Sequence, residues 1–367
     1  MRKLIRAKVR FKGLSVGLDI HKKFIQFSVM DRKGNEIEHG QVRSTAEELK
    51  KLVERLKAKD AVQFSLEACG CFIWIFDHLS EQIGKQFVHV AHPAKLAAVK
   101  SREKNDSNDA WWLAYQLYEG TLPEAMVAEG PLRELRIATR ELRWYTDTRS
   151  DAMRRIRSHL ALMGKSIPGD FLSSQCKRQT TREIIKEVQG NRGLALKRLW
   201  KTVRQASRVI VEWKAQVAEL VKNLAEVKLM KNELPGFGTT VSSTVFAELG
   251  LPQRFRSAKA YAKSTGLTSG YRNTGGKTTK IEMTREGSPH ARWALTRAII
   301  GCMRCKKGPG AQVRAWVEER SQHRVKKKVI VAAARKLAEG VWRLFAMGEA
   351  FDLARAFPVK APISAQR

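Results

Sequence analysis

The sequence predicts an α/β amino-terminal domain followed by a remainder that is all-α. Short apolar or alternating runs, which are typical of strands, are concentrated between Leu14 and Val90. From Pro131 onward, apolar residues recur every three or four positions, which is the period of an amphipathic helix. With 367 residues, 43% of them hydrophobic, the chain is long enough for two or three domains with a real core.

The amino-terminal elements follow a regular order along the chain. Strands are expected at 14–20, 24–30, 36–43, 62–66 and 87–90, and helices after residue 45, at about 72–82, after residue 93 and from about residue 106. Thr45 followed by Glu48 has the spacing of a capping box, which marks the start of the first helix. The fourth strand ends on an acid, Glu67.

Three antiparallel strands followed by helix, strand, helix, strand and helix is the order of the ribonuclease-H-like fold. In that fold the first strand is central, and the strand after the first helix lies beside it. We therefore expect Asp19, on the first strand, and Glu67 to meet at one edge of the sheet. Asp106 and Asp109 would then lie over them from the last helix, because residues three apart share a helix face.

Four carboxylates in this arrangement predict a site for two divalent ions, Mg²⁺ or Mn²⁺, held by Asp19, Glu67, Asp106 and Asp109. Paired metals of this kind stabilise the attacking and leaving oxygens of phosphodiester chemistry. Each acid alone also has an ordinary structural explanation, as a turn former, a solvated loop residue or a helix cap. The combination of all four, in fold order, favours metal binding.

The chain is strongly basic along its whole length. Lys and Arg total 69 against 36 for Asp and Glu, a formal charge of +33, which is typical of a protein that lies along a polyanion. We find no apolar run of about 18 residues and no signal-peptide pattern in the first ten residues, so we expect a cytosolic protein with no membrane partner. The five cysteines suggest reduced thiols, and the Cys302 and Cys305 pair suggests core packing rather than zinc.

Two long amphipathic helices are expected in the middle of the chain, at about 132–163 and 196–227. The regular apolar spacing of the second predicts an antiparallel helical hairpin or an intermolecular coiled coil. A packed helix of one domain explains the apolar stripe equally well, but we favour oligomerisation, as a dimer or a tetramer. The expected domains are residues 1–125, 126–230 and 231–367.

The third region is expected to be mainly helical and to bind nucleic acid. It opens with a Gly-x-Gly turn at Gly236 and Gly238, which presents backbone N–H groups to a phosphate as in helix-hairpin-helix proteins. Residues 267–278 form a loop of glycines, hydroxyls and cations, which either offers a nucleophile or only neutralises backbone charge. The residues expected to contact nucleic acid are Lys22, Lys104, Gly236, Gly238, Arg272, Lys277 and Arg285.

These motifs resemble those of the DEDD-type transposases of insertion sequences, relatives of the Piv invertase that act as bridge-RNA-guided recombinases. The matching segments are 17–22, 66–68, 104–110, 235–238, 247–250 and 266–277. The resemblance implies a RuvC-like catalytic domain and a carboxyl-terminal transposase domain. It also implies an enzyme that cuts and rejoins double-stranded DNA at an element end and a target, with a structured guide RNA that pairs with both.

The sequence departs from this family at the expected nucleophile. The family places a serine just before the glycine of the last loop, where this chain has Asn273 and Thr274. Thr274 is one candidate for the attacking hydroxyl, and Ser269, through a shifted loop, is another. A third alternative is that the step is lost. Two other functions therefore stay open, namely a RuvC-like nuclease that uses metal-activated water and a catalytically decayed RNA- or DNA-binding protein.

Overall fold

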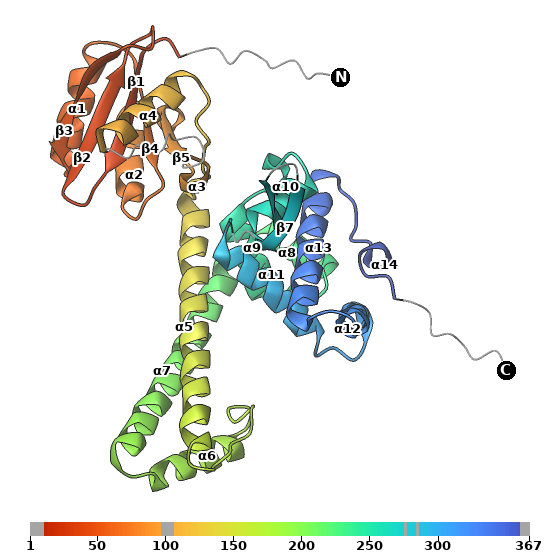
Figure 1. Ribbon diagram of the computed structural model, residues 1–367. Helices are drawn as coiled ribbons and strands as arrows, with labels where there is room; N and C mark the ends of the chain where they lie inside the picture. The colour runs from red at the N-terminus through yellow and green to blue at the C-terminus, as the bar shows by residue number, and fades with distance from the viewer. Residues whose placement is uncertain (1–10, 97–105, 275–276, 284–285, 360–367) are drawn as a thin grey trace. The chain divides into compact units, whose positions relative to one another are not determined.

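The computed structural model describes residues 11–96, 106–274, 277–283 and 286–359 (Figure 1). Contacts between residues divide the chain into two units, residues 1–127 and 128–367. The division into three domains at residues 125 and 230 stays a prediction.

The amino-terminal unit contains a five-stranded mixed sheet with the strand order β3-β2-β1-β4-β5 (Figure 1). The strands are β1 (Leu14–Ile20), β2 (Phe24–Met30), β3 (Glu36–Arg43), β4 (Val62–Glu67) and β5 (Val88–Ala91). β1, β2 and β3 are antiparallel, whereas β4 is parallel to β1 and β5 is parallel to β4. The predicted central position of β1, with β4 beside it, is confirmed.

Helices α1 (Ala46–Lys57) and α2 (Phe72–Ile83) pack on one face of this sheet. Val16 and Leu18 of β1 are fully buried against their apolar side chains, since alternate residues of a strand point to the same face. The expected cap of α1 is present, because the Thr45 side chain accepts a hydrogen bond from the Glu48 backbone N–H. A 3₁₀ turn (Lys85–Phe87) and the short helix α3 (Pro93–Leu96) flank β5.

Helix α4 (Asp106–Tyr118) packs on the opposite face, and Gly17 of β1 makes this possible. A Cβ atom at Gly17 would lie 2.0 Å from the carbonyl oxygen of Ala110, so only glycine admits the helix backbone at this distance. At the other end of α4, the Tyr118 ring lies against Gly34 in the turn after β2. The helix therefore runs antiparallel to β1 and starts near the edge of the sheet where β1 ends.

The carboxyl-terminal unit begins with two long helices, α5 (Gly130–Ala161) and α7 (Gly190–Leu220), which pair along their length (Figure 1). Leu142 of α5 clusters with Ile210 of α7, and further along α5, Ile156 clusters with Leu196 near the start of α7. The two helices are therefore antiparallel, and α6 (Gln175–Glu187) contributes Ile185 to the second cluster. The helical hairpin forms within one chain, and an intermolecular coiled coil stays a prediction.

The rest of this unit is mainly helical, as predicted. Its helices are α8 (Ala225–Glu233), α9 (Thr239–Leu249), the 3₁₀ turn Pro252–Arg254, α10 (Ala258–Ser264), α11 (Pro289–Cys302), α12 (Gly308–Ser321), α13 (Lys326–Ala346) and α14 (Leu353–Ala356). All five cysteines are free thiols, and burial raises the pKa of Cys302, which packs in the core, to about 12. Among the helices of the described residues, none is long and apolar enough to cross a bilayer.

One element differs from the expectation. Residues 267–278 were expected as a loop, but the backbone forms an antiparallel hairpin of β6 (Ser269–Thr274) and β7 (Lys277–Met283). Gly275 and Gly276 lie in the sequence between Thr274 and Lys277, which pair with each other, and two consecutive glycines between strands are a signal for a two-residue hairpin turn. The composition of the segment suggested a loop, whereas its turn chemistry specifies strands.

Replacing Gly17 by alanine tests the close approach of α4 to the sheet. We expect Gly17→Ala to lower the free energy of unfolding by about 1–3 kcal/mol, because the added methyl group must displace the α4 backbone. Gly70→Ala is the matched control, since a Cβ atom there meets nothing within 4 Å. Urea unfolding monitored by hydrogen exchange of α4 checks the difference, and equal stability of the two variants would contradict it.

Candidate active site

Asp19 and Glu67 lie side by side at one edge of the five-stranded sheet. β1 and β4 are parallel and pair Leu18 with Leu66, so the two acids are the next residues along neighbouring strands. Residues in register on adjacent strands are about 5 Å apart and point to the same face. The Asp19 side chain is 18% exposed and that of Glu67 is half-buried, so solvent reaches both carboxylates.

The start of α4 brings the other two acids to the same edge. Asp106 is the first residue of the helix, and the half-buried Asp109 directly precedes Ala110, whose carbonyl oxygen approaches Gly17. The side chain of Asp106 lies outside the described part of the structure. Among the side chains that are described, no three from His, Cys, Asp and Glu form a group that could hold a metal ion. The four-carboxylate metal site therefore stays a prediction.

His21 is a member of this site that the sequence reasoning did not single out. Its Nε2 atom lies 3.0 Å from Oδ2 of Asp19, and its ring packs against Phe24 with the ring centres 4.5 Å apart. His21 follows Asp19 by two residues, and that spacing places both on one face of an extended chain. The contact restrains the Asp19 carboxylate, as outer partners do for metal-binding acids.

The two candidate nucleophiles occupy opposite ends of the β6–β7 hairpin. Thr274 pairs with Lys277 at the tip, whereas Ser269 pairs with Met283 at the base. Five residues of extended strand separate them by roughly 16 Å. The side chains of residues 269–282 lie outside the described part of the structure, so the roles of both hydroxyls stay predictions. Their separation means that one cannot replace the other without moving the whole hairpin.

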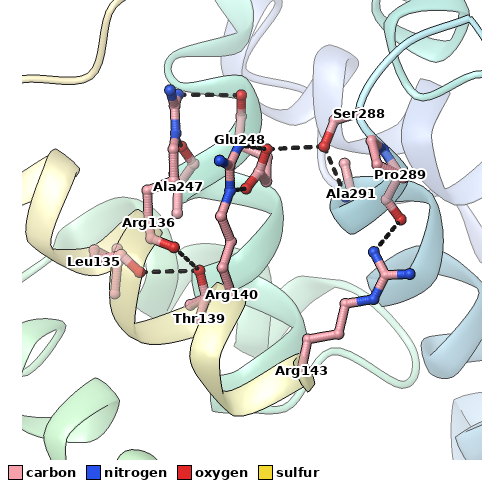
Figure 2. A network of polar contacts seen from close by, with 10 residues as sticks. All are labelled: Leu135, Arg136, Thr139, Arg140, Arg143, Ala247, Glu248, Ser288, Pro289 and Ala291. Atoms are coloured by element: carbon pink, nitrogen blue, oxygen red, sulfur yellow. Dashed lines mark hydrogen bonds and ion pairs between the residues drawn. The ribbon is translucent and has the colours of Figure 1, made fainter. Parts of the chain in front are cut away.

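In the carboxyl-terminal unit, Glu248 is at the centre of the most buried ionic network of the described residues, which Figure 2 draws. Its carboxylate accepts two hydrogen bonds from Arg140, at 2.7 Å from Nε and 3.1 Å from Nη2. It also accepts one from the Ser288 hydroxyl at 2.8 Å. In the sequence, Glu248 lies in the segment 247–250 that resembles the transposase family, and its partner arginine could not be predicted because it lies 108 residues away in the chain.

The network joins three helices. Arg136 of α5 donates to the carbonyl oxygen of Ala247 at the end of α9, and Arg143 donates to that of Pro289 at the start of α11 (Figure 2). Ser288 also accepts a hydrogen bond from the Ala291 N–H and so caps α11. β7 ends at Met283 and α11 begins at Pro289, so this network holds the helix that follows the hairpin in the chain.

The charge of Glu248 is maintained by its partners. Burial raises the pKa of this carboxyl. The hydrogen bonds and charge of Arg140, together with the hydrogen bond of Ser288, lower it by more, so the net pKa lies below its ordinary value. The side chain is only 4% exposed, so the ion pair is largely removed from water. Burial lowers the pKa of His290, the charge of Glu248 raises it, and with the charges of Arg140 and Arg143 the net pKa lies below its ordinary value.

The structure describes some of the residues predicted to contact nucleic acid fully, some by their backbone alone, and others not at all. Gly236 has a left-handed φ of +78°, and a Cβ atom there would lie 2.4 Å from the Ala298 carbonyl oxygen, so packing alone requires this glycine. Gly238 is exposed at the start of α9, and Lys22 is exposed in the β1–β2 turn. Arg272 and Lys277 lie on the hairpin with undescribed side chains, and Lys104 and Arg285 lie outside the described residues.

Comparison with known proteins covers both units. A family model described as a transposase matches residues 16–164, and the model of the transposase IS116/IS110/IS902 family matches residues 231–314. The transposase for insertion sequence element IS1328 of Yersinia enterocolitica is 24% identical over 344 residues, which cover 92% of this chain and 98% of that protein.

Two further relatives come from Sinorhizobium fredii, and both are named as transposases. One, y4pF/y4sB, is 30% identical over 32% of this chain and 31% of its own length, and y4qE is 24% identical over 79% of this chain and 72% of its own length. With the strand order and the edge carboxylates, these matches define the class of the protein, a DNA transposase of an insertion sequence. The chain belongs to the IS110 family of DEDD transposases, as its motifs predicted.

The buried carboxylate predicts a specific pH dependence of stability. Because the pKa of Glu248 is lower in the folded chain than its ordinary value of 4.5, the stability it contributes is present above pH 4.5 and is lost as the pH falls through the folded pKa. Glu248→Gln should remove this part of the acid destabilisation. At pH 7 it should lower the free energy of unfolding by about 1–3 kcal/mol, as the charged hydrogen bonds to Arg140 are lost.

The control for this prediction is Glu219→Gln, whose ion pair with Lys222 is exposed. That change should shift stability by less than about 0.5 kcal/mol. Urea unfolding between pH 3 and pH 7, followed by hydrogen exchange in α9 and α11, measures both variants. If the free energy of unfolding of Glu248→Gln depended on pH as that of the wild type does, the Glu248 network would not control the acid sensitivity of stability.

Proposed function

We propose that this transposase cuts DNA strands at an insertion-sequence end and at its target and rejoins them, using Mg²⁺ or Mn²⁺ held by Asp19, Glu67, Asp106 and Asp109. The observation that carries the proposal is the close packing of α4 on Gly17, because it sets the start of α4 at the edge where β1 and β4 end. The strand order of the amino-terminal sheet supports a ribonuclease-H-like, RuvC-like fold for this unit.

The donor set fits a hard divalent cation, since carboxylate oxygens are the ligands that Mg²⁺ prefers. When bound, the metal supplies positive charge that stabilises the charge developing on the scissile phosphate. Asp19 and Glu67 would bind it from the sheet, and Asp106 and Asp109 from the helix. His21 would hold the Asp19 carboxylate in one orientation through their 3.0 Å contact.

We favour Thr274 over Ser269 as the nucleophile, because the tip of a hairpin reaches a DNA strand more readily than its base. The Thr274 hydroxyl oxygen would form a bond to the scissile phosphorus, and the bond from phosphorus to the deoxyribose oxygen would break. A base takes up the hydroxyl proton, and the departing deoxyribose oxygen is protonated. Attack by a second DNA end on the threonine-linked phosphate then reverses these steps and rejoins the strands.

We also propose that a structured guide RNA and partner subunits complete the assembly, as a dimer or tetramer. A charge of +33 supports the binding of one RNA and two DNA duplexes, because together they require many phosphate contacts. Pairing of subunits through a coiled coil is one arrangement for this assembly. The residues proposed to contact nucleic acid are Lys22, Lys104, Gly236, Gly238, Arg272, Lys277 and Arg285.

Neutral substitutions of the sheet acids test the metal site. Asp19→Asn and Glu67→Gln should each reduce Mg²⁺-dependent strand cleavage by about 100-fold or more, because a metal ligand is lost while the shape of the side chain is kept. DNA binding in EDTA should stay within a factor of about two. Glu47→Gln, an exposed acid on α1, is the control. Full cleavage by either sheet variant would exclude the acids from catalysis.

Trapping on a suicide substrate identifies the nucleophile. Thr274→Ala should abolish the covalent protein–DNA adduct, and Thr274→Ser should form it faster because the hydroxyl loses its neighbouring methyl group. Ser269→Ala should form it normally. The opposite pattern would assign the nucleophile to Ser269. Clean hydrolysis with no adduct from the wild type would favour a RuvC-like nuclease instead.

A further inference from the structure

A groove of about 640 Å³ lies between α5 and α11, and Arg143, which donates to the Pro289 carbonyl oxygen, lies where it meets the Glu248 network. Its charged lining consists of Arg143, Asp147, Asp151 and Arg154 from α5 and Arg292 and Arg297 from α11. Four arginines therefore face two aspartates, and the groove is positive even when both acids are ionised. Its volume is that of a pocket for a small molecule, so the groove can hold part of one nucleic-acid strand.

Trp293, which also lines the groove, contacts two of these arginines. The guanidinium carbons of Arg143 and Arg297 lie 5.7 Å and 5.5 Å from the centre of its ring. Cation–π contact holds the side chains in place, and an arginine fork is well suited to phosphate oxygens. The groove is thus preorganised to bind an anion.

The positive charges of the groove are crowded. Arg143 forms an ion pair with Asp147 at 3.3 Å, and Arg154 forms one with Asp151. Beside them, burial lowers the pKa of Arg149, and the charge of Arg297 lowers it further. A cluster of like charges is costly in a folded chain, and a bound anion would relieve that cost.

Trp144 gives the surface beside the groove an aromatic platform. Its side chain is 58% exposed, which is unusual for so large an apolar residue. It precedes Asp147 by three positions and Asp151 by seven, so it lies on the adjoining face of α5. An exposed tryptophan beside a basic groove is the combination that binds unpaired bases, because stacking adds to phosphate contacts.

We propose that the groove between α5 and α11 binds one unpaired DNA strand, with its phosphates on Arg154 and Arg297 and a base stacked on Trp144. The partner is DNA because the chain is a DNA transposase, and it is unpaired because a base inside a duplex has no free face to stack. The site holds a strand and performs no chemistry. The groove shares no residue with the proposed metal site or nucleophile, so its binding can be tested without metal.

The test measures binding of the full chain to a 20-nucleotide single strand, the matching duplex and an RNA of the same sequence, all in EDTA. The double variant Arg154→Gln/Arg297→Gln should weaken single-strand binding at least about 10-fold and reduce the slope of log affinity against log salt by about 1.4. Arg204→Gln/Arg208→Gln, which removes the same charge from exposed positions of α7, should weaken it much less.

Trp144→Ala should weaken single-strand binding about 5- to 100-fold and leave duplex binding unchanged, and Trp144→Phe should restore most of the loss because phenylalanine also stacks. Equal losses for the groove and control doubles would reduce the effect to general charge and overturn the proposal. A loss confined to the duplex or to RNA, or no loss, would also overturn it. If the groove variants lost DNA cleavage but bound the single strand normally, the proposal would likewise be overturned, because the groove would then affect catalysis without holding a strand.

Discussion

The absence of a side chain at Gly17 is the constraint on which the amino-terminal unit depends. The Ala110 carbonyl oxygen occupies the place where a Cβ atom would be, so α4 lies directly on the central strand. Two residues later, Asp19 lies on the same face just before β1 ends at Ile20, and the start of α4 lies near that end of the strand. One close backbone approach thus places the start of α4 near the end of the central strand that carries Asp19.

In the carboxyl-terminal unit, a buried carboxylate, that of Glu248, fixes how the helices pack. Glu248 satisfies its charge with two hydrogen bonds from Arg140 and one from Ser288, and these contacts connect α9, α5 and α11. A buried ion pair is weak evidence for stability, because desolvation offsets much of its attraction. Its effect is geometric: it fixes the helix that follows the hairpin, whose tip carries the proposed nucleophile.

The arginines of α5 make two kinds of contact. Arg136 and Arg140 turn toward the end of α9, where backbone oxygens and a carboxylate fix them. Arg154, further along the helix, faces the groove with α11, while Arg143 contributes to both regions. Basic residues on one helix therefore serve packing at one end and anion binding further along, and the total charge of the chain does not separate these roles.

The sequence by itself determined the strands and long helices, since period and capping are local, and it placed Asp19, Glu67 and α4 in fold order. The β6–β7 hairpin was not predicted, because the many glycine, hydroxyl and basic residues of this segment suggested a loop. The predicted fifth strand also ended one residue before β5 does. Only the tertiary structure decided which arginine meets Glu248, that His21 contacts Asp19, and that α5 and α11 form a basic groove. These features join side chains distant in sequence or depend on orientation, and no local pattern records either.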